Sequence, residues 1–153
     1  MSLMEQIYKQ VILERSRRPR HHGALSDADL RQEGVNPSCG DELTLSLKVE
    51  GDRIVDAAFE GHGCAISQAS ADLMAEALRG RSRAEARALS GAFKSMIRGE
   101  PIPEDIDLGD LKALEGIRRL HARVKCATLP WTTLETALNG AGGIASDEAD
   151  ASG

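Results

Sequence analysis

The stretch LTLSLKVEGDRIVDAAFE, residues 43–60, decides the fold. Its first half alternates apolar with polar residues, the apolar ones being Leu43, Leu45, Leu47 and Val49. Its second half does the same with Val55, Ala57 and Phe59. Alternation with period two is typical of a half-buried strand, because successive side chains point to opposite faces. The polar turn at residues 50–53 lies between the two halves, so the stretch predicts a β-hairpin.

Helical periodicity replaces this alternation on both sides of the hairpin. Residues 4–14 form a first predicted helix, whose apolar face holds Met4, Ile7, Tyr8, Val11 and Ile12. Residues 66–77 predict a second helix that stops at Gly80. Ser82 and Glu85 have the spacing of a capping box, so a third helix should follow and end near Gly99.

Two more helices are expected toward the C-terminus. A short one covers residues 108–117, and a last one begins near Cys126 and runs to Leu138. Pro130 suits this last helix only within its first turn, because proline lacks a backbone N–H. Residues 24–36 are interpreted as a polar loop. The predicted fold class is therefore α+β, a small antiparallel β-sheet with helices packed on it.

Length and composition restrict the class of protein. The chain has 153 residues and 41% hydrophobic residues, which indicates one globular domain, assigned to residues 1–138. Residues 139–153 are rich in Gly, Ala and acids, and we expect them to be disordered. A net charge of −5 argues against a general nucleic-acid binder. There is no membrane-length apolar run and no signal-peptide pattern, so a cytoplasmic location is expected.

A basic run follows the first helix, with Arg15, Arg17, Arg18 and Arg20 around Pro19. We interpret it as a solvated loop. A docking patch for an acidic partner is the alternative.

The chain has three cysteines, and each lies at the end of a predicted element. Cys39 precedes the first strand, Cys64 follows the second, and Cys126 lies near the start of the last helix. Helix N-termini at Cys64 and Cys126 would lower the thiol pKa and favour thiolate, the form that binds metals and attacks electrophiles. Disulfides are rare in the cytoplasm, which leaves a metal site, a reactive thiol or buried small side chains as the open readings.

A tetrahedral zinc site needs a fourth ligand. Asp41 is the best candidate, since it is two residues from Cys39 and both side chains can point the same way along an extended segment. His62, two residues before Cys64, is the rival, and His121 is third.

The chain resembles the SufU family of sulfur acceptors in bacterial iron–sulfur cluster assembly, which is related to the IscU scaffolds. The resemblance covers about residues 7–138. The stretches that carry it are IYKQVI (7–12), RRPRHHG (17–23), NPSCGDEL (36–43), FEGHGCAIS (59–67), DLGDLKALEGI (107–117) and ARVKCATLPW (122–131). Lys125 stands where IscU-type chains have His, and residues 99–120 look like the insertion of SufU-type chains. His62 and His121 depart from the family pattern, and neither is expected to be a ligand.

The resemblance implies a function and its site. It implies a zinc ion held by Cys39, Asp41, Cys64 and Cys126, with Cys39 as the catalytic residue. Cys39 would accept persulfide sulfur from a cysteine desulfurase of the SufS type, a pyridoxal-phosphate enzyme. Arg123 would lie near the site as a supporting or partner-contact residue.

Two alternatives stay open at this stage. One is an iron–sulfur cluster assembly scaffold that uses the same three cysteines. The other is a zinc-stabilised interaction module without covalent chemistry, so whether the protein acts as an enzyme stays open as well.

Overall fold

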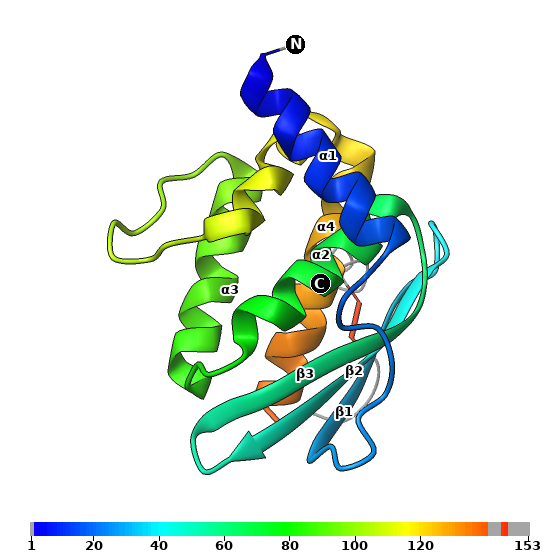
Figure 1. The fold of residues 1–153 in the computed structure, drawn as a ribbon, viewed down its shortest axis with the longest axis vertical. Coiled ribbons are helices and arrows are strands. Elements are labelled where there is room, and N and C mark those ends of the chain that lie inside the picture. Colours follow the sequence, from blue (N-terminus) through cyan, green and yellow to red (C-terminus); the bar gives the residue numbers. More distant parts are fainter. Residues whose placement is uncertain (1, 141–144, 147–153) are drawn as a thin grey trace.

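A computed structural model describes residues 2–140, 145 and 146. Its elements, in chain order, are α1 (Leu3–Arg17), β1 (Leu30–Asn36), β2 (Asp41–Glu50), β3 (Arg53–His62), α2 (Ala65–Leu78), α3 (Arg83–Arg98), the 3-10 helix η1 (Gly109–Arg119) and α4 (His121–Leu138) (Figure 1). The α+β prediction is confirmed: helices pack on a small antiparallel sheet.

The sheet has the strand order β1-β2-β3, and both pairs are antiparallel. The predicted hairpin is β2 and β3, with Leu45 opposite Phe59 and both side chains fully buried. A register shift between Lys48 and Val49 changes one detail of the prediction. Because of it, Ile54 is buried in place of Val55, which is only half-buried.

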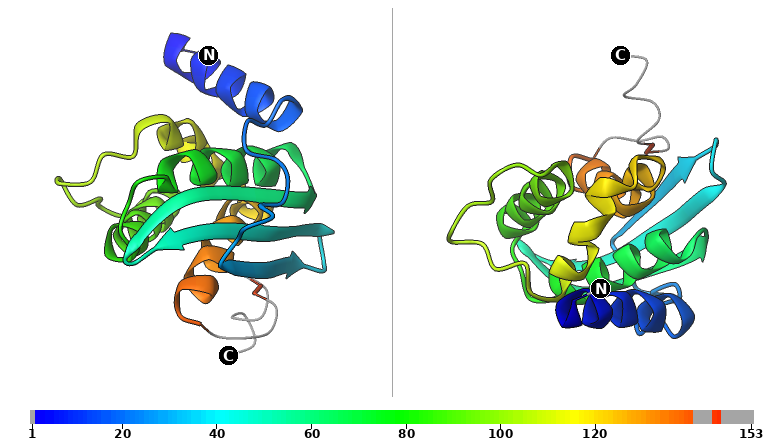
Figure 2. Two further views of the ribbon diagram at one scale, coloured as in Figure 1. Left: turned by 60° about the horizontal axis from the view of Figure 1, so that its bottom comes forward. Right: turned by 90° about the horizontal axis from the view of Figure 1, so that it is seen from above.

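Helices cover one face of the sheet (Figure 2). α2 packs against β3, α4 packs against β1, and α1 lies outside them on α2. The buried core includes Phe93 of α3 stacked on Trp131 of α4, with ring centroids 4.8 Å apart. α3 begins with the predicted capping box of Ser82 and Glu85 and ends at Gly99 in the left-handed conformation.

Arg15 corrects the interpretation of the basic run. It lies inside α1 and is 3% exposed, with Nη1 2.8 Å from Asp72 Oδ2 and Nη2 2.7 Å from Glu76 Oε2. These two ion pairs hold the C-terminal half of α1 against α2. At the other end of α1, Met4 and Ile7 are exposed, so only part of the predicted apolar face reaches the core.

The last helix also differs from expectation. α4 begins at His121, five residues before Cys126, and contains Pro130 in its interior. Pro130 lacks the N–H that would bond to the Cys126 carbonyl. The helix nevertheless continues, because Leu129, Pro130 and Trp131 are all buried against neighbouring elements.

β1 replaces the C-terminal part of the loop expected at residues 24–36. At its outer edge, Ala145 pairs with Gly34 in a parallel bridge and is 5% exposed. Residues 141–144 and 147–153 of the predicted disordered tail lie outside the described residues, and the boundary at residue 138 stays a prediction. No helix among the described residues is long and apolar enough to span a bilayer.

Candidate metal centre

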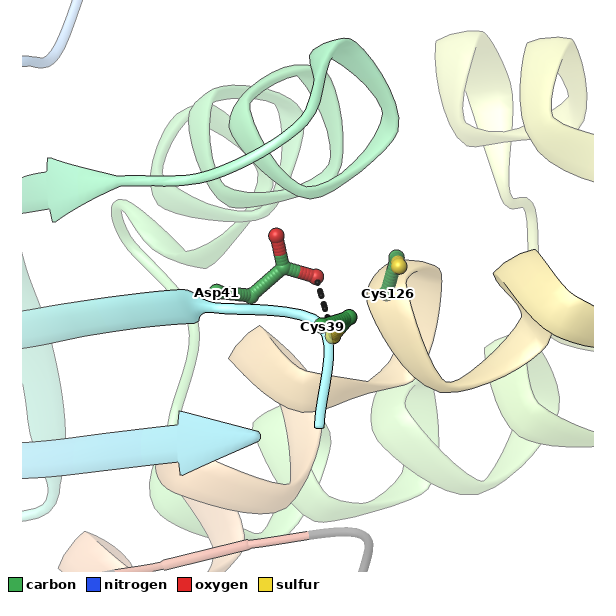
Figure 3. Close-up of side chains that lie close together, drawn as sticks. All are labelled: Cys39, Asp41 and Cys126. Carbon is green, nitrogen blue, oxygen red and sulfur yellow. Dashed lines mark hydrogen bonds between the residues drawn. The ribbon is translucent and has the colours of Figure 1, made fainter. Parts of the chain in front are cut away.

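Three segments bring the predicted site residues to one end of the sheet. Cys39 lies in the tight turn between β1 and β2, and Asp41 is the first residue of β2. Cys64 is the N-cap of α2, two residues after the end of β3. Cys126 projects from α4 toward the turn (Figure 3). The hairpin geometry therefore places Cys39, Asp41 and Cys64 near one another, and α4 adds Cys126 from the far end of the sequence.

The ligand atoms of Cys39, Asp41 and Cys126 all lie within 4.8 Å of one another. Cys39 Sγ donates to Asp41 Oδ2 at 3.2 Å, the dashed contact in Figure 3. Asp41 is 1% exposed and Cys126 is fully buried, whereas Cys39 is exposed. The group thus extends from the core to the surface, and Cys39 is its accessible member.

The second carboxylate oxygen of Asp41 is held by α2. Oδ1 accepts the backbone N–H of Cys64 at 3.0 Å and the hydroxyl of Ser67 at 3.4 Å. Burial alone would raise the pKa of Asp41, but hydrogen bonds from Cys126, the Cys64 backbone, Cys39 and Ser67 outweigh it and lower the pKa. Asp41 is therefore a fixed, ionised carboxylate facing the thiols.

The thiol pKa of Cys126 is raised and not lowered as the sequence predicted. Burial, followed by its hydrogen bond to Asp41 and the charge of Cys64, raises the pKa of Cys126 well above its usual range. Cys126 lies inside α4 rather than at its N-terminus, so the expected helix-terminus effect is absent there. A bound cation would lower the pKa of the Cys126 thiol again, because a metal ion deprotonates a thiol that coordinates it.

Cys64 occupies the edge of this arrangement. Among the described residues it lies outside the 4.8 Å group, although its thiol is close enough to Cys126 and Arg123 to influence the pKa of both. The histidine rivals are not brought in either. His62 is exposed and pairs with Glu42 Oε1 at 3.3 Å, and His121 is exposed at the first turn of α4.

The donor set fits a zinc ion. Cysteine thiolates and a carboxylate are ligands that zinc accepts. The Asp41 carboxylate is buried, and the thiols beside it supply no positive charge to balance its negative charge, which a zinc ion would do. Arg123, at the surface of α4, is a cation beside the cluster: its hydrogen bond to Cys126 and the charges of Cys64 and Cys126 raise the pKa of Arg123.

Sequence reasoning missed the residues that position the ligands. Ser67 holds Asp41, Asn36 bonds to the Cys39 turn, and Lys125 reaches Ser38. Ser67 could have been found, because it lies one helical turn after Cys64 on the same face of α2.

Comparison with known proteins identifies the family of this chain. The family model of the NifU-like N terminal domain matches residues 7–127, and the chain belongs to this family.

Two curated relatives cover most of the chain. One is the zinc-dependent sulfurtransferase SufU of Bacillus subtilis (strain 168), 42% identical over 132 residues, which are 86% of this chain and 89% of the relative. The other is the iron–sulfur cluster assembly scaffold protein IscU of Streptococcus pyogenes serotype M1, 39% identical over 138 residues, 90% of this chain and 86% of the relative.

The solved structures place the fold in the same group. A putative SUF-system scaffold protein from Fervidobacterium islandicum AW-1 (FiSufU) has a TM-score of 0.81 at 42% identity, covering 88% of this chain and 98% of that one. The N-terminal NifU-like protein of Brucella abortus has a TM-score of 0.78 at 29% identity, covering 90% of this chain and 96% of that one.

Proposed function

We propose that this protein is a zinc-dependent sulfurtransferase of iron–sulfur cluster assembly that accepts persulfide sulfur from a cysteine desulfurase of the SufS type. The observation that carries the proposal is the position of Cys39, an exposed residue whose thiol donates to the buried Asp41 carboxylate and lies within 4.8 Å of the buried Cys126 thiol. The similarity to the B. subtilis sulfurtransferase supports it. Three cysteines without a disulfide suit the reducing cytoplasm, where we place this activity.

Cys39, Asp41, Cys64 and Cys126 would hold the zinc. Cys64 would join the other three through its side chain, since its backbone N–H is already bonded to Asp41. A bound zinc ion would keep the thiols deprotonated and, having no redox chemistry, would not oxidise them.

Cys39 would carry out the transfer. Its thiolate attacks the terminal sulfur of the partner's persulfide, a new bond forms between Cys39 Sγ and that sulfur, and the partner's S–S bond breaks. The electron pair of the broken bond leaves with the partner's cysteine as a thiolate, and the persulfide proton stays on the transferred sulfur. No external oxidant or reductant is needed. Cys39 is suited to this role because it alone of the three clustered side chains is exposed.

Asp41 and Arg123 would support this step. A carboxylate in place of a fourth thiolate makes the ligand set less electron-rich, so Cys39 should leave it more easily. An Asp41→Cys variant that binds zinc and accepts sulfur at the full wild-type rate would contradict this. Arg123 is exposed, and its guanidinium lies beside the thiols of Cys126 and Cys64. There it would stabilise the anionic form of these thiols or contact the partner.

The first experiment is elemental analysis of the purified wild type and Asp41→Ala, followed by sulfur transfer from a persulfide-loaded desulfurase. About one zinc per chain in the wild type, reduced in the variant, with persulfide found on Cys39 by mass spectrometry, is the expected result. A zinc-loaded wild type that takes no sulfur onto Cys39 would overturn the proposal. It would favour the alternative function, a zinc-stabilised interaction module without covalent chemistry.

The scaffold alternative rests on the similarity to the S. pyogenes IscU. It predicts bound iron and visible absorption bands after cluster loading in place of a colourless zinc protein. Elemental analysis and a spectrum therefore distinguish the two functions.

A further inference from the structure

The turn that carries Cys39 is fastened to the core at Asn36, the last residue of β1. Asn36 is fully buried, and its backbone carbonyl accepts the N–H groups of Cys39 at 3.2 Å and Gly40 at 3.0 Å. The Cys39 thiol also approaches this carbonyl, at 3.6 Å. These contacts fix the stem of the turn but leave its tip, at Ser38 and Cys39, exposed.

Lys125 of α4 bonds to both the stem and the tip. Its backbone carbonyl accepts the side-chain amide of Asn36 at 3.0 Å. Its ammonium Nζ donates to Ser38 Oγ at 2.6 Å. Ser38 and Lys125 directly precede Cys39 and Cys126 in the sequence, so this hydrogen bond joins the two chain segments that supply the two clustered thiols.

We propose that Lys125 is a positioning residue for sulfur transfer. Its hydrogen bond to Ser38, called the latch below, holds Cys39 beside Asp41 and Cys126 and has to open when Cys39 turns toward a persulfide. The inference rests on the proposed function, because only an acceptor cysteine has to leave the site.

The two contacts of Lys125 are suited to different tasks. The bond from Asn36 is made by a buried side chain, so the stem stays in place when the tip moves. The latch is made at the surface, where water can replace either partner, and a hydrogen bond of this kind contributes little net stability. The latch can therefore bias the position of Cys39 without locking it.

The test measures how fast Cys39 reacts with iodoacetamide in the zinc-loaded protein without a partner, followed by mass spectrometry. Ser38→Ala and Lys125→Met should each accelerate alkylation of Cys39 about five-fold, the factor that corresponds to one net hydrogen bond. The double variant should be no faster than the faster single one, since both changes remove the same contact. Lys125→Arg keeps a cationic donor and should stay within about two-fold of the wild type.

A purely electrostatic role gives a different pattern. If the ammonium acted only as a nearby positive charge, Lys125→Met would slow the alkylation of Cys39 and Ser38→Ala would leave it unchanged, which would overturn the latch. Equal rates in all variants would also overturn it. A variant that binds less than one zinc per chain would also contradict the latch. The hydrogen bond between Lys125 and Ser38 would then be needed for zinc binding itself.

A matched control and a second assay complete the design. Lys112→Met removes an exposed lysine of η1 and should leave the alkylation rate unchanged. Sulfur transfer from a persulfide-loaded desulfurase is measured in parallel. A wild type that accepts no sulfur refutes the proposed function, whereas a wild type that accepts sulfur while the alkylation rates do not change refutes the latch alone.

Discussion

Gly63→Ala should weaken metal binding without a change in any ligand. A Cβ atom at position 63 would lie 2.5 Å from Asp41 Oδ1 and closer still to Ser67 Oγ. Both atoms belong to side chains, so the clash would be relieved by displacement of the Asp41 carboxylate and the Ser67 hydroxyl. The backbone of Gly63 needs no positive φ, so the effect is steric rather than conformational.

The magnitude follows from the contacts that Asp41 would lose. Asp41 Oδ1 accepts the Cys64 N–H at 3.0 Å and the Ser67 hydroxyl at 3.4 Å. A hydrogen bond to a charged group contributes about 1.5–3 kcal/mol, and about 1.4 kcal/mol corresponds to a tenfold change in an equilibrium constant. If one such bond is lost, zinc affinity should fall by roughly 10- to 100-fold.

The assay is competition for zinc against a chromophoric chelator. Gly91→Ala is the matched control, because Gly91 is exposed in α3 and a Cβ there meets nothing within 4 Å. The control should keep wild-type affinity and gain up to about 1 kcal/mol of helix stability. Wild-type zinc affinity in a folded Gly63→Ala protein would refute the argument that Asp41 must stay in its present position.

Three further predictions concern stability. Arg15→Met should lower the free energy of unfolding by about 3–5 kcal/mol in urea titrations, because it leaves the Asp72 carboxylate unpaired in the core. Burial works to raise the pKa of Glu76, but the hydrogen bond and charge of Arg15 lower it below the ordinary 4.5. Glu76 therefore stabilises the fold above pH 4.5 and loses this contribution as the pH falls through its lowered pKa, so Glu76→Gln should flatten the acid limb of a urea-midpoint profile. Gly34→Ala places a Cβ 3.2 Å from the Cβ of Thr133 and nearer its hydroxyl, which should destabilise the fold by about 1–3 kcal/mol, partly recovered by Thr133→Ala in the double variant.

Controls separate these effects from general perturbation. Arg20→Met removes an exposed arginine that also approaches Glu76, at 3.5 Å, and should change the unfolding free energy by less than about 0.5 kcal/mol. Equal losses in Arg15→Met and Arg20→Met would contradict the assigned role of the buried pair. An acid limb unchanged by Glu76→Gln would contradict the assignment of the pH effect, and a wild-type unfolding midpoint in Gly34→Ala would contradict the packing of β1 on α4.

The hairpin and α3 could be predicted because local sequence determines them. Leu45 and Phe59 face the core at the positions their alternation indicates, and the capping box of Ser82 with Glu85 starts α3 where expected. The hairpin alone also brings Cys39 and Asp41 toward Cys64. That part of the candidate site could be predicted from local sequence, since it depends only on the pairing of β2 with β3.

β1 could not be predicted, because most of its core-facing residues are not apolar. Leu30 packs on the core, but the next positions on the same face are Gln32, Gly34 and Asn36, so the strand has no sustained hydrophobic alternation. Gly34 is small because Thr133 of α4 packs directly against it. A contact between residues so distant in the chain leaves no periodic pattern.

The position of Cys126 was missed for a related reason. Pro130 indicated a helix start, but the burial of Trp131 and its neighbours on both sides stabilises a helix through the proline. In η1, by contrast, the short helix expected at residues 108–117 is present, and it is a 3-10 helix. Leu111, Leu114 and Ile117 recur every third residue and are all buried, which is the repeat of a 3-10 helix.

Two of the single-residue bridges at the margins of the sheet, at Phe59 and at Gly34, have a consequence for self-association. Phe59 of β3 exchanges backbone hydrogen bonds with residues 21 and 23, and β1 exchanges them with Ala145. Open strand edges are templates on which identical chains stack into fibrils. Each of these bridges pairs part of one outer strand within the chain, so a shorter stretch of each edge is left open to pair with another copy.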